Sequence, residues 1–155
     1  MKNPGKHFDI SRFRAAQDEP TPGHAGYSQA LAELRAGSKQ SHWMWYVFPQ
    51  AAGLGFSEMA VRYAVGSLAE AEAILADGVL SARLSECVEA MLAHAGRIPA
   101  GRILGHLDGE KFHASMTLFA RVSGEGSVFQ RALAAFFGGK SHAASVAILE
   151  GWAGS

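Results

Sequence analysis

The sequence predicts an all-α (mainly α) protein with a compact, single-domain, non-repeat arrangement of helices. Apolar residues recur at spacings of three and four in almost every segment, which is the pattern of helices with one buried face. Glycines and prolines separate these segments, and no alternation with a period of two is sustained. At 155 residues the whole chain, 1–155, is expected to form one domain with its core over about residues 8–150, while residues 1–7 and 19–26 are expected to be flexible.

The composition is that of a soluble globular protein. Hydrophobic residues make up 48% and charged residues 18%, and the formal net charge is zero. Neither general nucleic-acid binding nor attraction to an anionic membrane is therefore predicted. Cys87 is the single cysteine, which is typical of a reducing compartment, and no stretch reaches the roughly 18 consecutive apolar residues of a membrane span. We expect a cytoplasmic protein, a monomer or small homo-oligomer, that needs no cofactor.

Two helices are predicted in the N-terminal quarter of the chain. Asp9 is a suitable N-cap for the first, and Gln17 near its end is expected to face solvent or to cap the helix. The second covers residues 27–36, and Gly37 stands where a C-cap glycine belongs.

The segment 41–57, SHWMWYVFPQAAGLGFS, is the densest in aromatic residues. A short aromatic run favours a strand by propensity, and its periodicity alone does not decide. We predict a helix over 41–48, because Ser41 can serve as its N-cap and Pro49 ends it.

The remaining segments read as helices from their periodicity and their caps. Ser57, Ser67, Asp108 and Ser127 are the predicted N-caps, and Ser67 with Glu70 matches a capping box. The predicted ranges are 57–64, 67–76, 79–95, 108–119, 127–137 and 141–152.

Several motifs point together to a known family. They are FDISRF, AQD, YSQALAELRAGSKQSHWMWYVFPQAAGLGFS, RYAV, LSECVEAML and DGEKFHASMTLF. Over residues 8–150 the chain resembles the domain-of-unknown-function family 1810, and the core SHWMW, FPQ, GLG and S is highly specific. The resemblance implies a small, mainly helical domain without an established activity. His142 and Ser145 depart from the family pattern, in which an acidic residue and a threonine are usual.

Some members of that family carry the label calpastatin. An inhibitor of that kind works as a disordered chain, whereas this sequence is aromatic, punctuated by glycine and globular in composition. The label is therefore rejected for this chain.

The aromatic segment supplies the first candidate ligand-binding residues. Trp43 and Trp45 have ring faces that can stack on a planar ring such as a nucleobase, and the alternative is that they anchor the core. His42 beside them can act as an acid, a base or a ligand donor near neutral pH, and the alternative is a structural histidine.

The turn after the aromatic residues supplies a second group. Gln50 offers an amide, Gly53 and Gly55 allow close approach to the backbone, and Ser57 can present N–H groups to an anion. A single G-x-G is weak, and a plain turn followed by a helix cap is the alternative.

Lysines and a serine form the third group. Lys111 and Ser115 are one helical turn apart, so together with Lys39 they can meet a phosphate or a carboxylate. The alternative is a solvated Lys111 paired with Asp108. No metal site is predicted, because the spacing of the histidines and carboxylates around residues 106–113 matches no zinc arrangement, and no context for a serine or cysteine nucleophile is present.

These groups predict a pocket for a small anionic, ring-containing, nucleotide-like metabolite. A faint likeness of the C-terminal half to ADP-ribose-processing helical domains adds the hypothesis that an ADP-ribose-linked or nucleotide-derived bond is hydrolysed. His42, Lys111 and Ser115 are the candidate catalytic residues for that reaction. The alternative function is a non-catalytic protein-interaction module.

Overall fold

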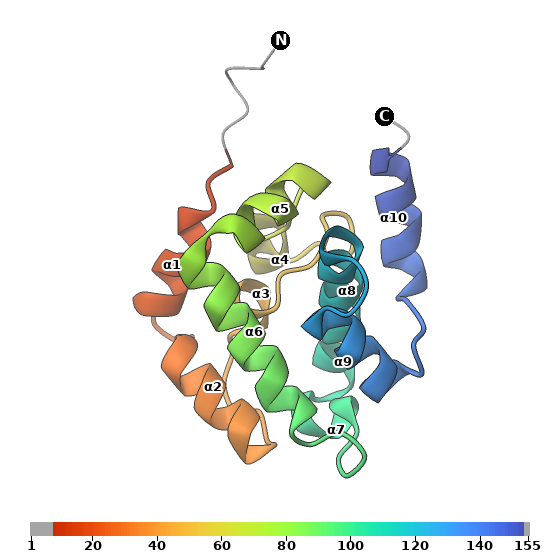
Figure 1. Ribbon diagram of the computed structural model, residues 1–155. Helices are drawn as coiled ribbons and strands as arrows, with labels where there is room; N and C mark the ends of the chain where they lie inside the picture. Colours follow the sequence, from red (N-terminus) through yellow and green to blue (C-terminus); the bar gives the residue numbers. More distant parts are fainter. Residues whose placement is uncertain (1–7, 154–155) are drawn as a thin grey trace.

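The computed structural model describes residues 8–153, and this part of the chain forms ten helices (Figure 1). An isolated parallel bridge between Ala51 and Val65 is its one element of β structure, so the predicted all-α class is confirmed. Residues 1–7, predicted to be flexible, lie outside the described part. The helices are α1 (Ser11–Asp18), α2 (Tyr27–Ala36), α3 (Met44–Val47), α4 (Glu58–Arg62), α5 (Leu68–Ala76), α6 (Gly78–Leu92), α7 (Ala100–Leu104), α8 (His106–Ser123), α9 (Val128–Phe137) and α10 (Ala143–Ala153).

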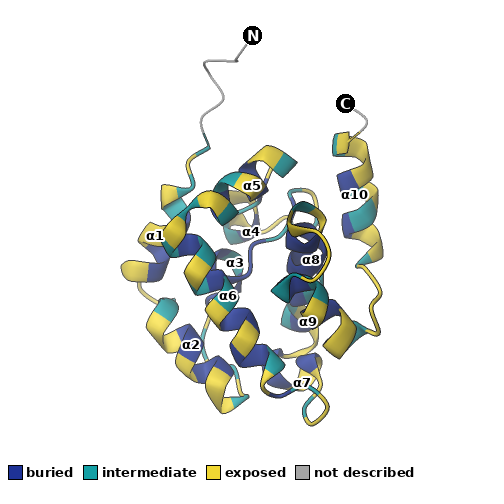
Figure 2. Cartoon of the chain, in the orientation of Figure 1, coloured by how far each residue is buried: buried dark blue, intermediate teal, exposed yellow. Residues whose placement is uncertain are grey.

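Helix α8 is the centre of the fold. It contacts α3, α5, α7, α9 and α10, and residues 114–120 are buried without interruption. Figure 2 shows this stretch of α8 in the colour of buried residues, enclosed by helices with exposed outer faces. A helix that is buried on all sides belongs to the interior of a domain, so the other elements are arranged around α8.

Helix α6 crosses the front of the molecule in Figure 1 and packs against α2, α5 and α9. It carries Cys87, which has no exposed surface. Burial, with a smaller contribution from Glu86, raises the pKa of the Cys87 thiol to about 12. Within residues 8–153, no helix combines the length and the hydropathy needed to cross a bilayer.

Three predicted N-caps are confirmed. The hydroxyl oxygens of Ser57, Ser67 and Ser127 each accept a hydrogen bond from the backbone N–H three residues later. The predicted C-cap of α2 is confirmed as well, since Gly37 has a φ of 74°, a left-handed conformation that glycine adopts at little cost.

Three predicted N-caps are wrong. Asp9 does not cap α1: the N-cap position belongs to Ile10, and Oδ1 of Asp9 accepts from the hydroxyl of Ser11. Helix α3 is a single turn that begins at Met44, and Ser41 hydrogen-bonds Glu33 instead of capping it. Helix α8 begins at His106, so Asp108 lies inside its first turn, where the carboxylate contacts Lys39 and Lys111. The side chains of Ser41 and Asp108 are bound by residues outside the helix that each was predicted to cap, Glu33 and Lys39 respectively.

Gln17 is buried rather than exposed, with 7% of its surface accessible, so the prediction that it faces solvent is wrong. Its Nε2 donates to the carbonyl oxygen of Tyr46 at 2.8 Å, and its Oε1 accepts from Arg83 at 3.1 Å. Gln17 thereby joins α1 to α3 and α6.

The loop 19–26 is tied to the aromatic segment. The N–H of Ala25 donates to the carbonyl oxygen of His42 at 3.0 Å, and the hydroxyl of Tyr46 donates to the carbonyl oxygen of Ala25 at 2.5 Å. These bonds hold the loop beside α3, next to the candidate site.

Arg12 connects α1 to the end of α4 and to the segment that follows it. Its guanidinium donates to the carbonyl oxygens of Arg62 and Ala64 at 2.9 and 2.8 Å. It also forms an ion pair with Glu70 at 2.9 Å. The arginine of the FDISRF motif is thus used to close the fold.

Candidate functional site

Trp43 lies in the core, with no exposed surface. Its indole N–H donates to Oε1 of Glu33 at 2.8 Å, and its ring is tilted against that of Phe48. Of the two interpretations of Trp43, the buried ring supports the core anchor, because in this arrangement neither ring face meets solvent.

Glu33 organises the chain that leads into the aromatic segment. Its carboxylate accepts hydrogen bonds from the backbone N–H groups of Gln40 and Ser41 at 2.9 and 3.0 Å and from the Ser41 hydroxyl at 2.6 Å. It also accepts from Trp43 and from Gln29, both at 2.8 Å. Burial by itself raises the pKa of Glu33, but these hydrogen bonds, led by that of Ser41, outweigh burial and lower it to about 2. Glu33 is therefore ionised at neutral pH and holds residues 40–43 in place.

Trp45, two residues after Trp43, is only partly buried. Its ring is nearly perpendicular to that of His24, with the ring centroids 5.6 Å apart. The Nζ of Lys111 lies over it, also 5.6 Å from the ring centroid. An indole with a cation over its face, open in part to solvent, is a surface on which a second ring can stack.

Lys39 and Lys111 share the carboxylate of Asp108. The Nζ of Lys39 lies 2.9 Å from one oxygen of Asp108, and the Nζ of Lys111 lies 3.2 Å from the other. The Lys39 side chain is 9% exposed and that of Lys111 is 30% exposed. The sequence left open a pairing of Lys111 with Asp108, and this pairing is present. The three side chains together carry a net positive charge.

A close approach of α7 to α8 places Lys39 beside Asp108. The backbone N–H of Lys39 donates to the carbonyl oxygen of Ile103 on α7 at 2.8 Å. A Cβ on Gly109 of α8 would lie 3.2 Å from the Cα of Gly101, so a side chain there would push the two helices apart.

Gln50 and the glycine turn lie against each other. The carbonyl oxygen of Gln50 accepts from the N–H of Val65 at 3.0 Å, which fixes its backbone. A Cβ on Gly55 would lie 2.8 Å from that of Ala60 and 3.4 Å from Nε2 of Gln50. Gly53 has a φ of 101°, which other residues rarely adopt. Gly55 thus lets the turn fold back against Gln50, whereas a Cβ on Gly53 would lie 3.3 Å from Cδ1 of Ile148.

Ser57 is occupied as a cap. Its hydroxyl oxygen accepts from the N–H of Ala60 at 3.1 Å, and the helix it caps, α4, has five residues. So short a helix has a small dipole, and the interpretation of residues 53–57 as a turn followed by a cap fits the structure better than that of an anion site.

Two candidate catalytic residues lie apart from Lys111. The side chain of His42 is exposed, and its backbone carbonyl holds the loop 19–26. Ser115 is fully buried one turn after Lys111, and within the described part of the chain its Oγ has no hydrogen-bond partner. Lys111 and Ser115 both lie on α8, but only Lys111 of this pair reaches the surface.

A narrow crevice opens beside Trp45. Its volume is about 10 Å³, room for one water molecule. The lining residues are Met44, Trp45, Phe48, Gln50, Ala60, Tyr63 and Lys111. Among the residues singled out from the sequence, the fold thus brings together Trp45, Gln50 and Lys111, with Lys39 reaching them through Asp108.

A cluster at the start of α10 was not predicted. Nδ1 of His142 accepts from the backbone N–H of Ser145 at 3.3 Å and lies 2.9 Å from its Oγ, while Nε2 lies 3.5 Å from Glu110. Burial, and then the neighbouring His113, lower the pKa of His142. A serine, a histidine and a glutamate in contact resemble a hydrolase triad in composition, but the Ser145 hydroxyl is fully buried, so the group serves as a helix cap. The sequence signal for this cap is that His142 directly precedes α10 and stands three residues before Ser145, the spacing of an N-cap and its partner.

The comparisons with known proteins agree with this fold. The crystal structure of the conserved hypothetical protein Rv1873 from Mycobacterium tuberculosis is similar, with 42% sequence identity and a TM-score of 0.84, over 92% of this chain and 97% of that chain. No curated protein matches. The family described as a protein of unknown function, DUF1810, matches residues 7–149. Because that match covers nearly the whole sequence and agrees with the motifs, the chain belongs to the DUF1810 family.

Proposed function

We propose that this protein binds a small anionic, ring-containing metabolite of nucleotide-like chemistry in the cytoplasm, at the surface formed by Lys39, Trp45, Gln50 and Lys111. One observation carries the proposal. Two ammonium groups converge on the single carboxylate of Asp108 beside a partly exposed indole. An anion next to this trio gains a favourable charge interaction without displacing the buried core.

Lys111 is the better placed of the two lysines to receive the anionic group. Its side chain is 30% exposed, whereas that of Lys39 is 9% exposed, and its contact with Asp108 is the longer one. A phosphate or carboxylate on Lys111 would hold an attached ring near the face of Trp45. Stacking on an aromatic side chain contributes on the order of 1–3 kcal/mol per base.

The size of the crevice sets how the ligand lies. With a volume of about 10 Å³ it admits one water but no ring. The ring therefore lies across the mouth, on Trp45, and the amide of Gln50 supplies both a donor and an acceptor for its polar edge.

Hydrolysis of an ADP-ribose-linked or nucleotide-derived bond is the further step of this proposal. It requires a general acid or base that reaches the ligand. Lys111 meets this condition at the crevice, and the exposed ring of His42 is the second candidate. Ser115 is buried and would require α8 to move, so the first assay is one of binding.

Tryptophan fluorescence tests the proposal directly. The Trp152→Phe variant keeps Trp43 and Trp45 as reporters, and it is titrated with ADP-ribose, NAD, AMP and inorganic phosphate. We expect saturable quenching by at least one ring-containing anion and a roughly tenfold weaker response after Lys111→Gln, because one charge-assisted hydrogen bond is lost.

Lys140→Gln is the matched control, since Lys140 is exposed and does not line the crevice. Calorimetry with Trp45→Phe and Trp45→Ala separates a loss of binding from a loss of the reporter. The proposal fails if the folded protein binds none of these compounds. It also fails if the affinity measured by calorimetry is unchanged in both Lys111→Gln and Trp45→Ala.

A protein-interaction module is the second candidate, favoured by exposed apolar residues after the glycine turn. Phe56 is 86% exposed and Val61 is 62% exposed. This candidate predicts self-association in sedimentation velocity that Phe56→Ser abolishes, together with no response to any nucleotide. A monomer at all concentrations, with an intact response to a nucleotide, would contradict it.

A further inference from the structure

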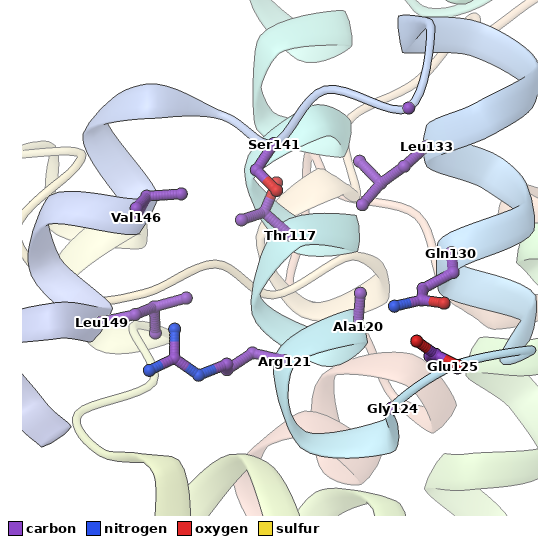
Figure 3. Close-up of a pocket in the computed structure, with 11 residues that line it drawn as sticks. Thr117, Ala120, Arg121, Gly124, Glu125, Gln130, Leu133, Ser141, Val146 and Leu149 are labelled. Carbon is purple, nitrogen blue, oxygen red and sulfur yellow. The ribbon is translucent and has the colours of Figure 1, made fainter.

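A larger cleft lies between α8, α9 and α10 (Figure 3). Its volume is about 570 Å³, within the range of small-molecule sites. None of its lining residues belongs to the crevice beside Trp45. The cleft is therefore a separate site, and ligand binding there is independent of the function proposed for the crevice.

The floor of the cleft is apolar. Ala120 of α8, Leu133 of α9, and Val146 and Leu149 of α10 line it from three helices. Figure 3 shows the side chains of Leu133 and Val146 directed into the space between the helices. This floor fits aliphatic groups of a ligand.

One cation and one anion lie at the end of α8. Arg121 and Glu125 have the spacing of a helical ion pair, but α8 ends at Ser123, and Gly124, with a φ of 81°, turns the chain away. Within the described residues neither side chain forms an ion pair or a hydrogen bond. In Figure 3, Arg121 extends toward Leu149 whereas Glu125 lies on the opposite side, near Gln130. The cleft thus presents its two charges at separate places.

Gln130 supplies a polar group between the helices. Its Oε1 accepts from the backbone N–H of Gly126 at 3.2 Å, which leaves the amide Nε2 as a donor. Figure 3 shows this nitrogen directed toward the cleft.

We infer that this cleft binds a short apolar peptide with free termini. The carboxylate of the peptide pairs with the guanidinium of Arg121, which matches it in a bidentate geometry. Its ammonium group pairs with Glu125, a peptide carbonyl accepts from Gln130, and its aliphatic side chains cover the floor. A fatty acid of the same size would pair with Arg121 but has no group that pairs with Glu125, so the two charges favour a zwitterion.

Calorimetry with free di-, tri- and tetrapeptides of leucine and alanine tests this inference, with the N-acetylated and C-amidated forms of each as chemical controls. We expect one length to bind, and each blocked terminus to weaken binding at least tenfold. Arg121→Gln is expected to weaken binding of the free peptide to the same degree, and amidation of the peptide should then have no further effect on its affinity. Glu125→Gln is likewise expected to weaken binding of the free peptide, and acetylation should then have no further effect on its affinity. Each of the two side chains is coupled to one terminus of the peptide.

Arg102→Gln is the matched control variant, an exposed arginine on α7 outside the cleft, and it should leave the affinity unchanged. Lys111→Gln should also leave it unchanged, which separates this site from the crevice. Circular dichroism confirms that each variant is folded. The inference is overturned if no peptide binds, if blocked and free peptides bind equally, or if octanoate binds as tightly as the best peptide.

Discussion

Trp43 and Trp45 stand two residues apart, yet their surroundings are opposite. Trp43 has no exposed surface and hydrogen-bonds the buried carboxylate of Glu33. Trp45 is partly exposed and lies under the ammonium group of Lys111. Trp43 precedes α3 in a non-helical conformation, with a φ of −160°, whereas Trp45 lies inside this helix. The start of this single-turn helix therefore separates an indole that belongs to the core from one that reaches the surface.

The two carboxylates near these rings differ in the same way. Glu33 accepts hydrogen bonds from Gln29, Gln40, Ser41 and Trp43. Asp108 contacts two lysine ammonium groups and keeps 21% of its side chain exposed. The inner carboxylate is fixed by the fold, whereas the outer one can exchange its partners with a ligand or with water.

The largest expected effect separates the two tryptophans. Trp43→Ala should lower the free energy of unfolding by about 3–5 kcal/mol, because a large buried side chain and the partner of Glu33 are both removed. Trp45→Ala should cost about 1 kcal/mol, since its ring is only partly buried. Urea unfolding followed by circular dichroism measures both. Equal costs would show that the two rings do not differ as described.

The next contrast compares the two carboxylates. Glu33→Gln should destabilise the protein by roughly 2–3 kcal/mol, because one of the acceptor oxygens becomes a donor facing other donors. Asp108→Asn should cost about 1 kcal/mol or less, as expected for a partly exposed ion pair. Denaturant titration at pH 7 compares the two variants, and a larger cost for Asp108→Asn would reverse the assignment of inner and outer roles.

The pH dependence of stability tests Glu33 independently. Its pKa is about 2 in the folded protein and 4.5 as the ordinary value, so folding favours the ionised form. The stabilisation is complete above about pH 5 and is lost as the pH falls toward 2, by roughly 3 kcal/mol in total. Urea midpoints measured between pH 5 and 3 should fall for the wild type and change less for Glu33→Gln. Parallel pH profiles would exclude Glu33 as the source.

A smaller contrast lies on α8, between a hydroxyl with partners and one without. Oγ1 of Thr117 donates to the carbonyl oxygen of His113 and accepts from the N–H of His142, both at 2.9 Å. Thr117→Val should therefore cost about 1–2 kcal/mol, while Ser115→Ala should change stability by about 0–0.5 kcal/mol. Thermal unfolding measures both. A large loss from Ser115→Ala would mean that its hydroxyl has a partner.

The smallest expected effect is at the start of α10. Aspartate is a better N-cap than histidine, so His142→Asp should stabilise the protein by about 0.5 kcal/mol at pH 7. The pKa of His142 is lowered in the folded protein, which favours the neutral ring. Stability from this residue is therefore present above its ordinary pKa of 6.5 and is lost as the pH falls below that value. Melting temperatures at pH 7.5 and 5.5 should converge in the variant, and an unchanged difference would contradict this role.

Local chemistry made much of the fold predictable from the sequence. Ser57, Ser67 and Ser127 bond to groups three residues away, so their caps can be inferred from the neighbouring residues alone. The roles of Ser41 and Asp108 could not be inferred in this way, because each side chain is bound by a residue outside the helix in question, Glu33 and Lys39 respectively. A local rule does not include such competitors.

The sequence predicted which residue types form the candidate site, but not which side chains face the surface. The segment 41–57 indicated Trp45 and Gln50, and the helical spacing indicated Lys111. The aromatic run alone does not distinguish the buried Trp43 from the partly exposed Trp45, because the orientation of this segment is set by hydrogen bonds with Glu33 and Gln17. The cleft that contains Arg121 was not predicted, since it exists only where three helices meet.

The buried thiol of Cys87 has a practical consequence. A cysteine with no exposed surface and a pKa near 12 stays protonated and out of reach of maleimide or iodoacetamide at neutral pH. The unmodified protein is therefore not expected to react with thiol-directed labels. A single cysteine introduced at exposed Ser141 would carry a dye at the rim of one cleft, and one at Phe56 would place the same dye beside the glycine turn, without any prior removal of Cys87.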